Sequence, residues 1–100
     1  MKYNKLVRDR IPEIIKKKGQ RVVFHIAKDK EYWEKLKEKL IEEIHEFYEQ
    51  ENGEEYADIL EVVEQVGKFK KFDRKKIALI KRKKLKERGG FGKRVILEES

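Results

Sequence analysis

Residues 35–69 read KLKEKLIEEIHEFYEQENGEEYADILEVVEQVGKF. At about 100° per residue, the apolar residues form one stripe in the first half of this stretch and another in the second half. Two acids border each stripe. They lie three residues apart within each pair, and so share one face of a helix. The four acids are Glu43, Glu46, Glu55 and Asp58.

The spacing predicts that these four carboxylates meet. When two amphipathic helices joined by a short turn pack antiparallel, acids that border the same side of both stripes converge. Two such charges about 4 Å apart repel by roughly 4 kcal/mol at an effective dielectric constant of about 20. A bound cation relieves this repulsion, and oxygen ligands favour Mg²⁺ or Mn²⁺. Acids make up 20 of the 100 residues, however, so any one pair is by itself more often a solvated helix face.

The composition is typical of a helix-rich protein, with 47% charged residues, one Pro and six Gly. Its length predicts a single domain over residues 1–100. The absence of Cys excludes disulfides and thiolate metal sites. No apolar run is long enough to span a membrane, and residues 1–10 lack the core of a signal peptide. We therefore expect a cytoplasmic protein without a membrane partner.

Charge is strongly segregated along the chain. Residues 31–64 contain thirteen acids and three bases, whereas residues 65–94 contain fourteen bases and two acids. This pattern suits a metal site for a polyanionic substrate, with basic side chains sharing the phosphate charge. It also suits a basic nucleic-acid-binding module. Stacking aromatics are not interleaved with the basic run, and the acidic helices would repel a duplex, so we expect no nucleic-acid partner.

The rest of the chain predicts a short N-terminal helix over about 12–18, a third main helix over 74–88, and strands over 21–26 and 95–97. The expected fold is mainly α: an antiparallel bundle of three main helices plus the short N-terminal helix, with a small two-stranded β element. Three main helices leave apolar surface uncovered, so we expect a homodimer or a higher homo-oligomer.

Four motifs together resemble one family, the all-α nucleoside triphosphate pyrophosphohydrolases, which include MazG-like and phosphoribosyl-ATP pyrophosphatase-like house-cleaning enzymes. The motifs are YNKLVRDRIP (3–12), EEIHE (42–46), EEYAD (54–58) and ERGGF (87–91). The resemblance covers nearly the whole chain. It implies Mg²⁺-dependent hydrolysis of a nucleoside triphosphate to the monophosphate and pyrophosphate, with the four acids as metal ligands and catalytic residues. A member that has lost catalysis is an alternative.

Five cations are candidates for binding the substrate phosphates: Lys5, Arg8, Lys81, Lys84 and Arg88. The last three lie at helical spacing, where they could clamp phosphate oxygens or form a solvated basic face. Arg8 could instead tie the chain to an acid.

Selectivity for a base is left open by the sequence. Trp33 could stack on a base, although a lone aromatic in an apolar stripe is more often core. Glu42 and Glu54 fall on other helix faces, so we expect both to be solvated. Only eight residues separate Glu46 from Glu55, which leaves little room for a base-recognising insertion.

Overall fold

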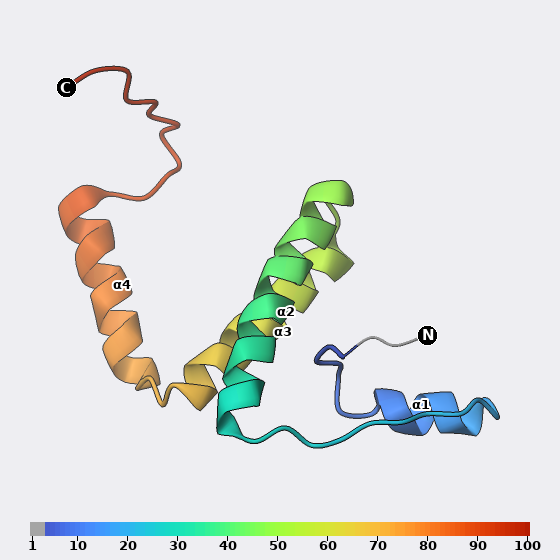
Figure 1. Cartoon of the computed structure of the whole chain (residues 1–100). Helices are drawn as coiled ribbons and strands as arrows, with labels where there is room; N and C mark the ends of the chain where they lie inside the picture. Colours follow the sequence, from blue (N-terminus) through green and yellow to red (C-terminus); the bar gives the residue numbers. More distant parts are fainter. Residues whose placement is uncertain (1–3) are drawn as a thin grey trace. The chain divides into compact units, whose positions relative to one another are not determined.

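The computed structural model describes residues 4–100, and this range contains four helices. They are α1 (Ile11–Lys17), α2 (Asp29–Glu49), α3 (Gly53–Phe69) and α4 (Arg74–Arg88), all labelled in Figure 1. The chain divides into two compact units, the first ending at Phe69 and the second comprising Lys70–Ser100. Tyr3 of the opening motif lies outside the described residues. The expectation of a single domain stays a prediction.

Helices α2 and α3 pack side by side as an antiparallel hairpin (Figure 1). Aromatic contacts fix the register at both ends. The rings of Tyr32 and Phe69 lie 5.2 Å apart at the open end, and those of Phe47 and Tyr56 lie 6.4 Å apart near the connection. Between them, Leu36 is 1% exposed. This register decides which polar side chains of the two helices face one another.

The segment before α1 lies against the hairpin. It pairs with α2 through Lys5 and with α3 through Arg8. Helix α1 begins directly after this segment, with Pro12 in its first turn, where a missing N–H costs little. It ends before Gly19, whose φ of +77° is a left-handed conformation that glycine adopts without strain.

In the second unit, α4 has the bounds that the sequence predicts. The Asp73 side chain accepts hydrogen bonds from the backbone N–H groups of Lys75 and Lys76 and so caps the first turn. The helix ends at Gly89, which has a φ of +78°. No residue of α4 is buried. Within residues 4–100, no helix has both the length and the apolar character needed to cross a membrane.

The prediction of a two-stranded β element is wrong. Residues 21–26 and 95–97 are not helical, and no strand occurs in the part of the chain that the structure describes. Val23 and Ile26 are 80% and 85% exposed, and Val95 is 82% exposed. β-Branched residues favour a strand only where cross-strand neighbours cover them, and an isolated pair of strands is marginal. Neither segment has that cover here.

Candidate metal and phosphate site

Three carboxylates converge where α2 and α3 face each other near their connection. Glu43 comes from α2, whereas Glu55 and Asp58 come from the first turns of α3. Each offers one oxygen, and these three oxygens lie within 4.8 Å of one another. Glu43 is only 8% exposed and is the one buried polar residue among those described. The site is therefore partly shielded from water.

Glu46, the fourth acid predicted from the sequence, is not part of this group. It follows Glu43 by nearly one turn of α2, and its side chain is exposed. Its charge still acts on Glu55. The structure thus brings three of the four predicted ligands together and leaves the fourth at the rim.

The hairpin connection positions the acids of α3. The Asn52 side chain accepts a 2.9 Å hydrogen bond from the backbone N–H of Glu55, which fixes the first turn of the helix. Together with the nearby contact between Phe47 and Tyr56, this cap sets where Glu55 and Asp58 stand relative to Glu43.

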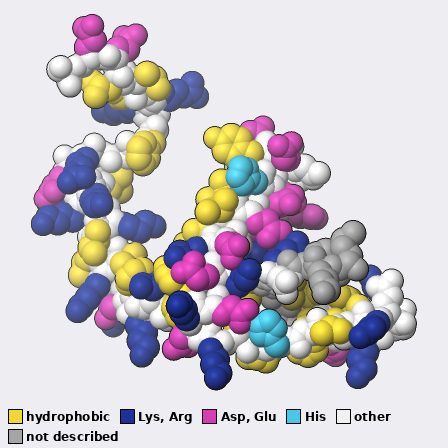
Figure 2. All heavy atoms as spheres, viewed as in Figure 1, with side chains coloured by type: hydrophobic (Ala, Val, Ile, Leu, Met, Phe, Trp, Pro, Cys, Tyr) yellow, Lys and Arg dark blue, Asp and Glu magenta, His cyan; other side chains and the backbone are white. Residues whose placement is uncertain are grey.

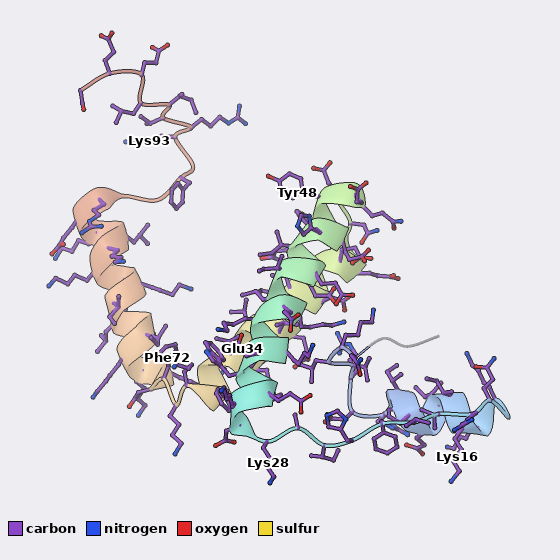
Figure 3. All side chains as sticks on the ribbon, in the orientation of Figure 1. Lys16, Lys28, Glu34, Tyr48, Phe72 and Lys93 are labelled. Atoms are coloured by element: carbon purple, nitrogen blue, oxygen red, sulfur yellow. The ribbon has the colours of Figure 1, made fainter. Side chains whose placement is uncertain are left out.

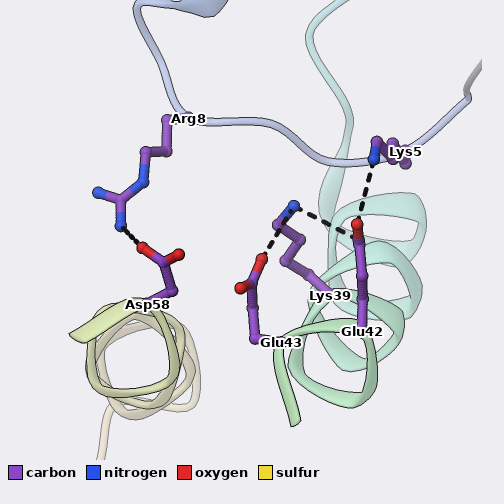
Figure 4. Close-up of polar contacts among 6 residues, drawn as sticks. All are labelled: Lys5, Arg8, Lys39, Glu42, Glu43 and Asp58. Carbon is purple, nitrogen blue, oxygen red and sulfur yellow. Dashed lines mark hydrogen bonds and ion pairs between the residues drawn. The ribbon is translucent and has the colours of Figure 1, made fainter. Parts of the chain in front are cut away.

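Cations of the chain neutralise most of this negative charge (Figure 4). Arg8 donates from Nη2 to Asp58 Oδ1 at 2.7 Å. The Nζ of Lys39 lies 3.2 Å from Glu43 Oε1. These two side chains come from opposite walls, since Arg8 belongs to the N-terminal segment and Lys39 to α2, one turn before Glu43.

Glu42 is also paired, contrary to the expectation that it is solvated. It accepts a hydrogen bond from Lys5 Nζ at 3.1 Å, and Lys39 Nζ lies 3.4 Å from its other oxygen. Partial burial acts to raise the pKa of the Glu42 carboxyl, but the hydrogen bond from Lys5 and the charge of Lys39 outweigh it and lower that pKa. Lys5 is thereby anchored beside the site.

Glu55 is the acid whose charge is least compensated. Partial desolvation raises the pKa of its carboxyl above the ordinary value of 4.5, and repulsion from Asp58, then Glu46 and Glu43, raises it further. Within residues 4–100 no cation forms an ion pair with Glu55. An additional cation at this point would relieve the repulsion directly.

A cleft of about 410 Å³ extends from Glu43 and Asp58 along the hairpin. The N-terminal segment, through Leu6 and Val7, forms one wall, and α2 and α3 form the other. At the carboxylate end the lining is ionic, with Arg8, Lys39 and Asp58. Such a cleft has room for a small organic phosphate as well as an ion.

The remaining predicted phosphate ligands, Lys81, Lys84 and Arg88, all lie on α4 in the second unit. All three are exposed, and none forms an ion pair with a described carboxylate. Their role stays a prediction.

Lys39 is a site residue that the sequence reasoning missed. Its side chain is only 17% exposed and lines the cleft. A signal was present, because Lys39 precedes Glu43 by four residues and therefore shares its helix face.

Comparisons with known proteins add little to this geometry. No model of a known protein family matches the chain, and no solved structure matches it. A protein of Mycolicibacterium smegmatis, described as uncharacterized, is 51% identical over 41 residues, which are 41% of this chain and 42% of that protein. The chain therefore spans less than half of that relative's length. The function proposed for this chain therefore rests on the geometry of the site.

Proposed function

We propose that this chain is a Mg²⁺-dependent nucleotide pyrophosphohydrolase, which cleaves a nucleoside triphosphate to the monophosphate and pyrophosphate. The observation that carries the proposal is the convergence of Glu43, Glu55 and Asp58 beside the cations of a cleft. The four sequence motifs that resemble this enzyme family also support it, and two of these motifs contain the three acids. We also propose that the protein is cytoplasmic.

The three carboxylates fit a hard divalent ion. Mg²⁺ is bound by oxygen at about 2.1 Å in octahedral geometry, so two of its ligand oxygens lie about 3.0 Å apart when adjacent and about 4.2 Å apart when opposite. The oxygens of Glu43, Glu55 and Asp58 lie within 4.8 Å of one another, so side-chain rotations would have to draw them together around the ion. A bound Mg²⁺ would offset the phosphate charge and lower the pKa of the attacking water. Mn²⁺ has similar ligand preferences.

The cations of the cleft would hold the phosphates. The planar guanidinium group of Arg8 can bind two phosphate oxygens at once. Its ion pair with Asp58 would break once another cation neutralised that carboxylate. Lys39 is less exposed and offers a single positive charge deeper in the cleft. Lys5, which already reaches Glu42, is within the same segment as Arg8. A carboxylate of the cluster would accept the proton of the attacking water.

Pyrophosphate release from nucleoside triphosphates in the presence of Mg²⁺ tests the proposal. Glu43→Gln and Asp58→Asn should each lower turnover by about a hundredfold or more, because even residues that merely orient metal ligands are worth about 10–100-fold. Glu49→Gln removes an exposed acid outside the cluster on the same helix, and should leave turnover unchanged. Equal activity in all three variants, or none in the unmutated chain, would contradict the proposal.

We also propose that a second copy of the chain covers one face of the hairpin. The apolar side chains Ile41, Ile44 and Tyr48 of α2 lie at helical spacing and are exposed, as are Leu60 and Val63 of α3. Hydrophobic side chains are visible along the hairpin in Figure 2, and Tyr48 projects away from it in Figure 3. Leu36 is the one hydrophobic residue buried within residues 4–100, which is too little core for a hairpin to be stable alone.

One observation favours an alternative function, the binding of nucleic acid. Within residues 4–100, no carboxylate forms an ion pair with any of the cations from Lys71 to Arg94. Basic side chains crowd the surface of this second unit (Figure 2). Salt-sensitive binding of RNA or DNA that persists in Glu43→Gln, without turnover of triphosphates, would favour this alternative.

A further inference from the structure

We propose that the end of the cleft farthest from the carboxylates binds a nucleotide base, and that Gln65 is the residue that hydrogen-bonds its edge. The inference rests on the proposed function only in assigning the opposite end of the cleft to the phosphates. The short connection between Glu46 and Glu55 leaves little room for a base-recognising insertion. This end of the cleft is instead the place where one base is selected over another.

The cleft changes in character along its length. Arg8, Lys39, Glu43 and Asp58 line one end, whereas Tyr32, Leu36, Val62 and Gln65 line the other. The exposed acid Glu61 also lines the cleft, nearly one turn of α3 after Asp58. On α2, Tyr32 precedes Glu43 by about 16 Å, and on α3, Gln65 follows Asp58 by about 10 Å, at a rise of about 1.5 Å per residue. Because the two helices are antiparallel, these two residues are at the same end. A phosphate chain held at the ionic end would direct its nucleoside towards the apolar end.

Tyr32 presents a fixed aromatic side chain in this part of the cleft. Its ring meets the Phe69 ring edge-on, with an interplanar angle of 76°. Phe69 in turn stacks on Trp33, with the two ring centroids 5.6 Å apart. Ordered aromatic rings bind bases by stacking, whatever the base. Trp33, the aromatic residue that the sequence suggested for stacking on a base, instead contacts Phe69 and Lys37. Among the described residues, it is not part of the cleft lining.

Gln65 adds the polar group that stacking lacks. Its side chain is half-buried and lines the cleft, and its amide forms no hydrogen bond with any residue from 4 to 100. No buried side-chain nitrogen or oxygen among these residues lacks a partner, so the amide is open to solvent and accessible to a ligand in the cleft. A carboxamide has both donors and an acceptor, which match the adjacent donor and acceptor on the edge of a base. Along α3, Gln65 lies about 10 Å from Asp58, so its neutral amide is too far away to bind the metal ion or the phosphates at the ionic end.

Equilibrium binding tests the proposal without requiring catalysis. In the presence of Mg²⁺, AMP, GMP, CMP and UMP are titrated calorimetrically into the full chain, and ribose 5-phosphate serves as the ligand without a base. At least one nucleotide should bind about tenfold more tightly than ribose 5-phosphate. Gln65→Leu keeps the size of the side chain and should reduce this ratio below about threefold, while binding of ribose 5-phosphate itself is unchanged.

Three further variants control this experiment. Tyr32→Phe should keep the ratio, whereas Tyr32→Ala should lower it. Gln20→Leu, at an exposed position outside the cleft, should behave as the unmutated chain. Melting curves identify any variant that fails to fold. If Tyr32→Ala fails to fold, the result for Gln65→Leu tests the proposal.

The outcomes separate this proposal from that of hydrolysis. Base-dependent binding that Gln65→Leu abolishes supports the base site, even if the chain releases no pyrophosphate and the hydrolase proposal fails. Equal binding of ribose 5-phosphate and all four nucleotides, or no binding of any, overturns it. A preference for a base that survives Gln65→Leu overturns the role of Gln65, even if pyrophosphate is released.

Discussion

Glu55 is the residue at which the cost of gathering acids is most visible. Its folded-state pKa is raised above 4.5, so the charged form disfavours folding. Such a group contributes stability below its ordinary pKa, and that stability is lost as the pH rises through the raised value. Without a divalent ion, Glu55→Gln should therefore raise the melting temperature at neutral pH and have little effect well below pH 4.5.

Thermal melts at the two pH values check this prediction, with Glu49→Gln as the control that lacks neighbouring acids of the cluster. If Glu55→Gln lowered the melting temperature at neutral pH, the carboxylate would be making favourable contacts, and crowding would be the wrong description. Saturating Mg²⁺ should remove the advantage of the variant, because the ion would stabilise the charged form.

At the scale of elements, the capping of α3 positions the site. Asn52→Ala removes the acceptor for the backbone N–H of Glu55 and should cost about 1 kcal/mol in the free energy of unfolding. Asn52→Ser keeps a capping oxygen and should lose less. Urea unfolding measures both. Identical stability of the two variants would show that the cap does not hold the first turn.

The elements that the sequence predicts well are those whose signals are local. The apolar stripes and the Asp73 cap predict the hairpin and α4, because helix periodicity and capping act within a few residues. The strands were predicted from β-branched composition, and they are absent from the described residues since a strand needs cross-strand neighbours that no local pattern supplies.

The residues of the candidate site also divide into those that local patterns predict and those that depend on long-range packing. Helix spacing predicts that Glu43, Glu55 and Asp58 meet once the two helices pack antiparallel. It predicts the same of Glu46, which lies outside the group, because spacing does not fix the register of the packing. Gln65 is not singled out by any local pattern, because its importance arises from the N-terminal segment that closes the cleft over it. That packing is a long-range contact, which single-sequence patterns do not encode.

On the scale of the whole molecule, the exposed face of the hairpin predicts self-association. Ile44→Glu places a charge in the proposed dimer face and should shift the chain to the monomer in sedimentation experiments, with a lower melting temperature. Val23→Glu alters a more exposed apolar residue outside that face and serves as the matched control. A monomeric unmutated chain, or a dimer unaffected by Ile44→Glu, would rule out this interface.

The stability of the full chain as a function of Mg²⁺ concentration tests the central claim most directly, because it requires no knowledge of the substrate. Saturating Mg²⁺ should raise the melting temperature of the unmutated chain by about 10 °C or more, since a ligand at roughly a hundred times its Kd adds about 2.7 kcal/mol. Glu43→Gln and Asp58→Asn should abolish most of this rise, and Glu49→Gln should retain it. A melting temperature that does not respond to Mg²⁺, or that rises equally in all four proteins, would contradict a metal site between α2 and α3.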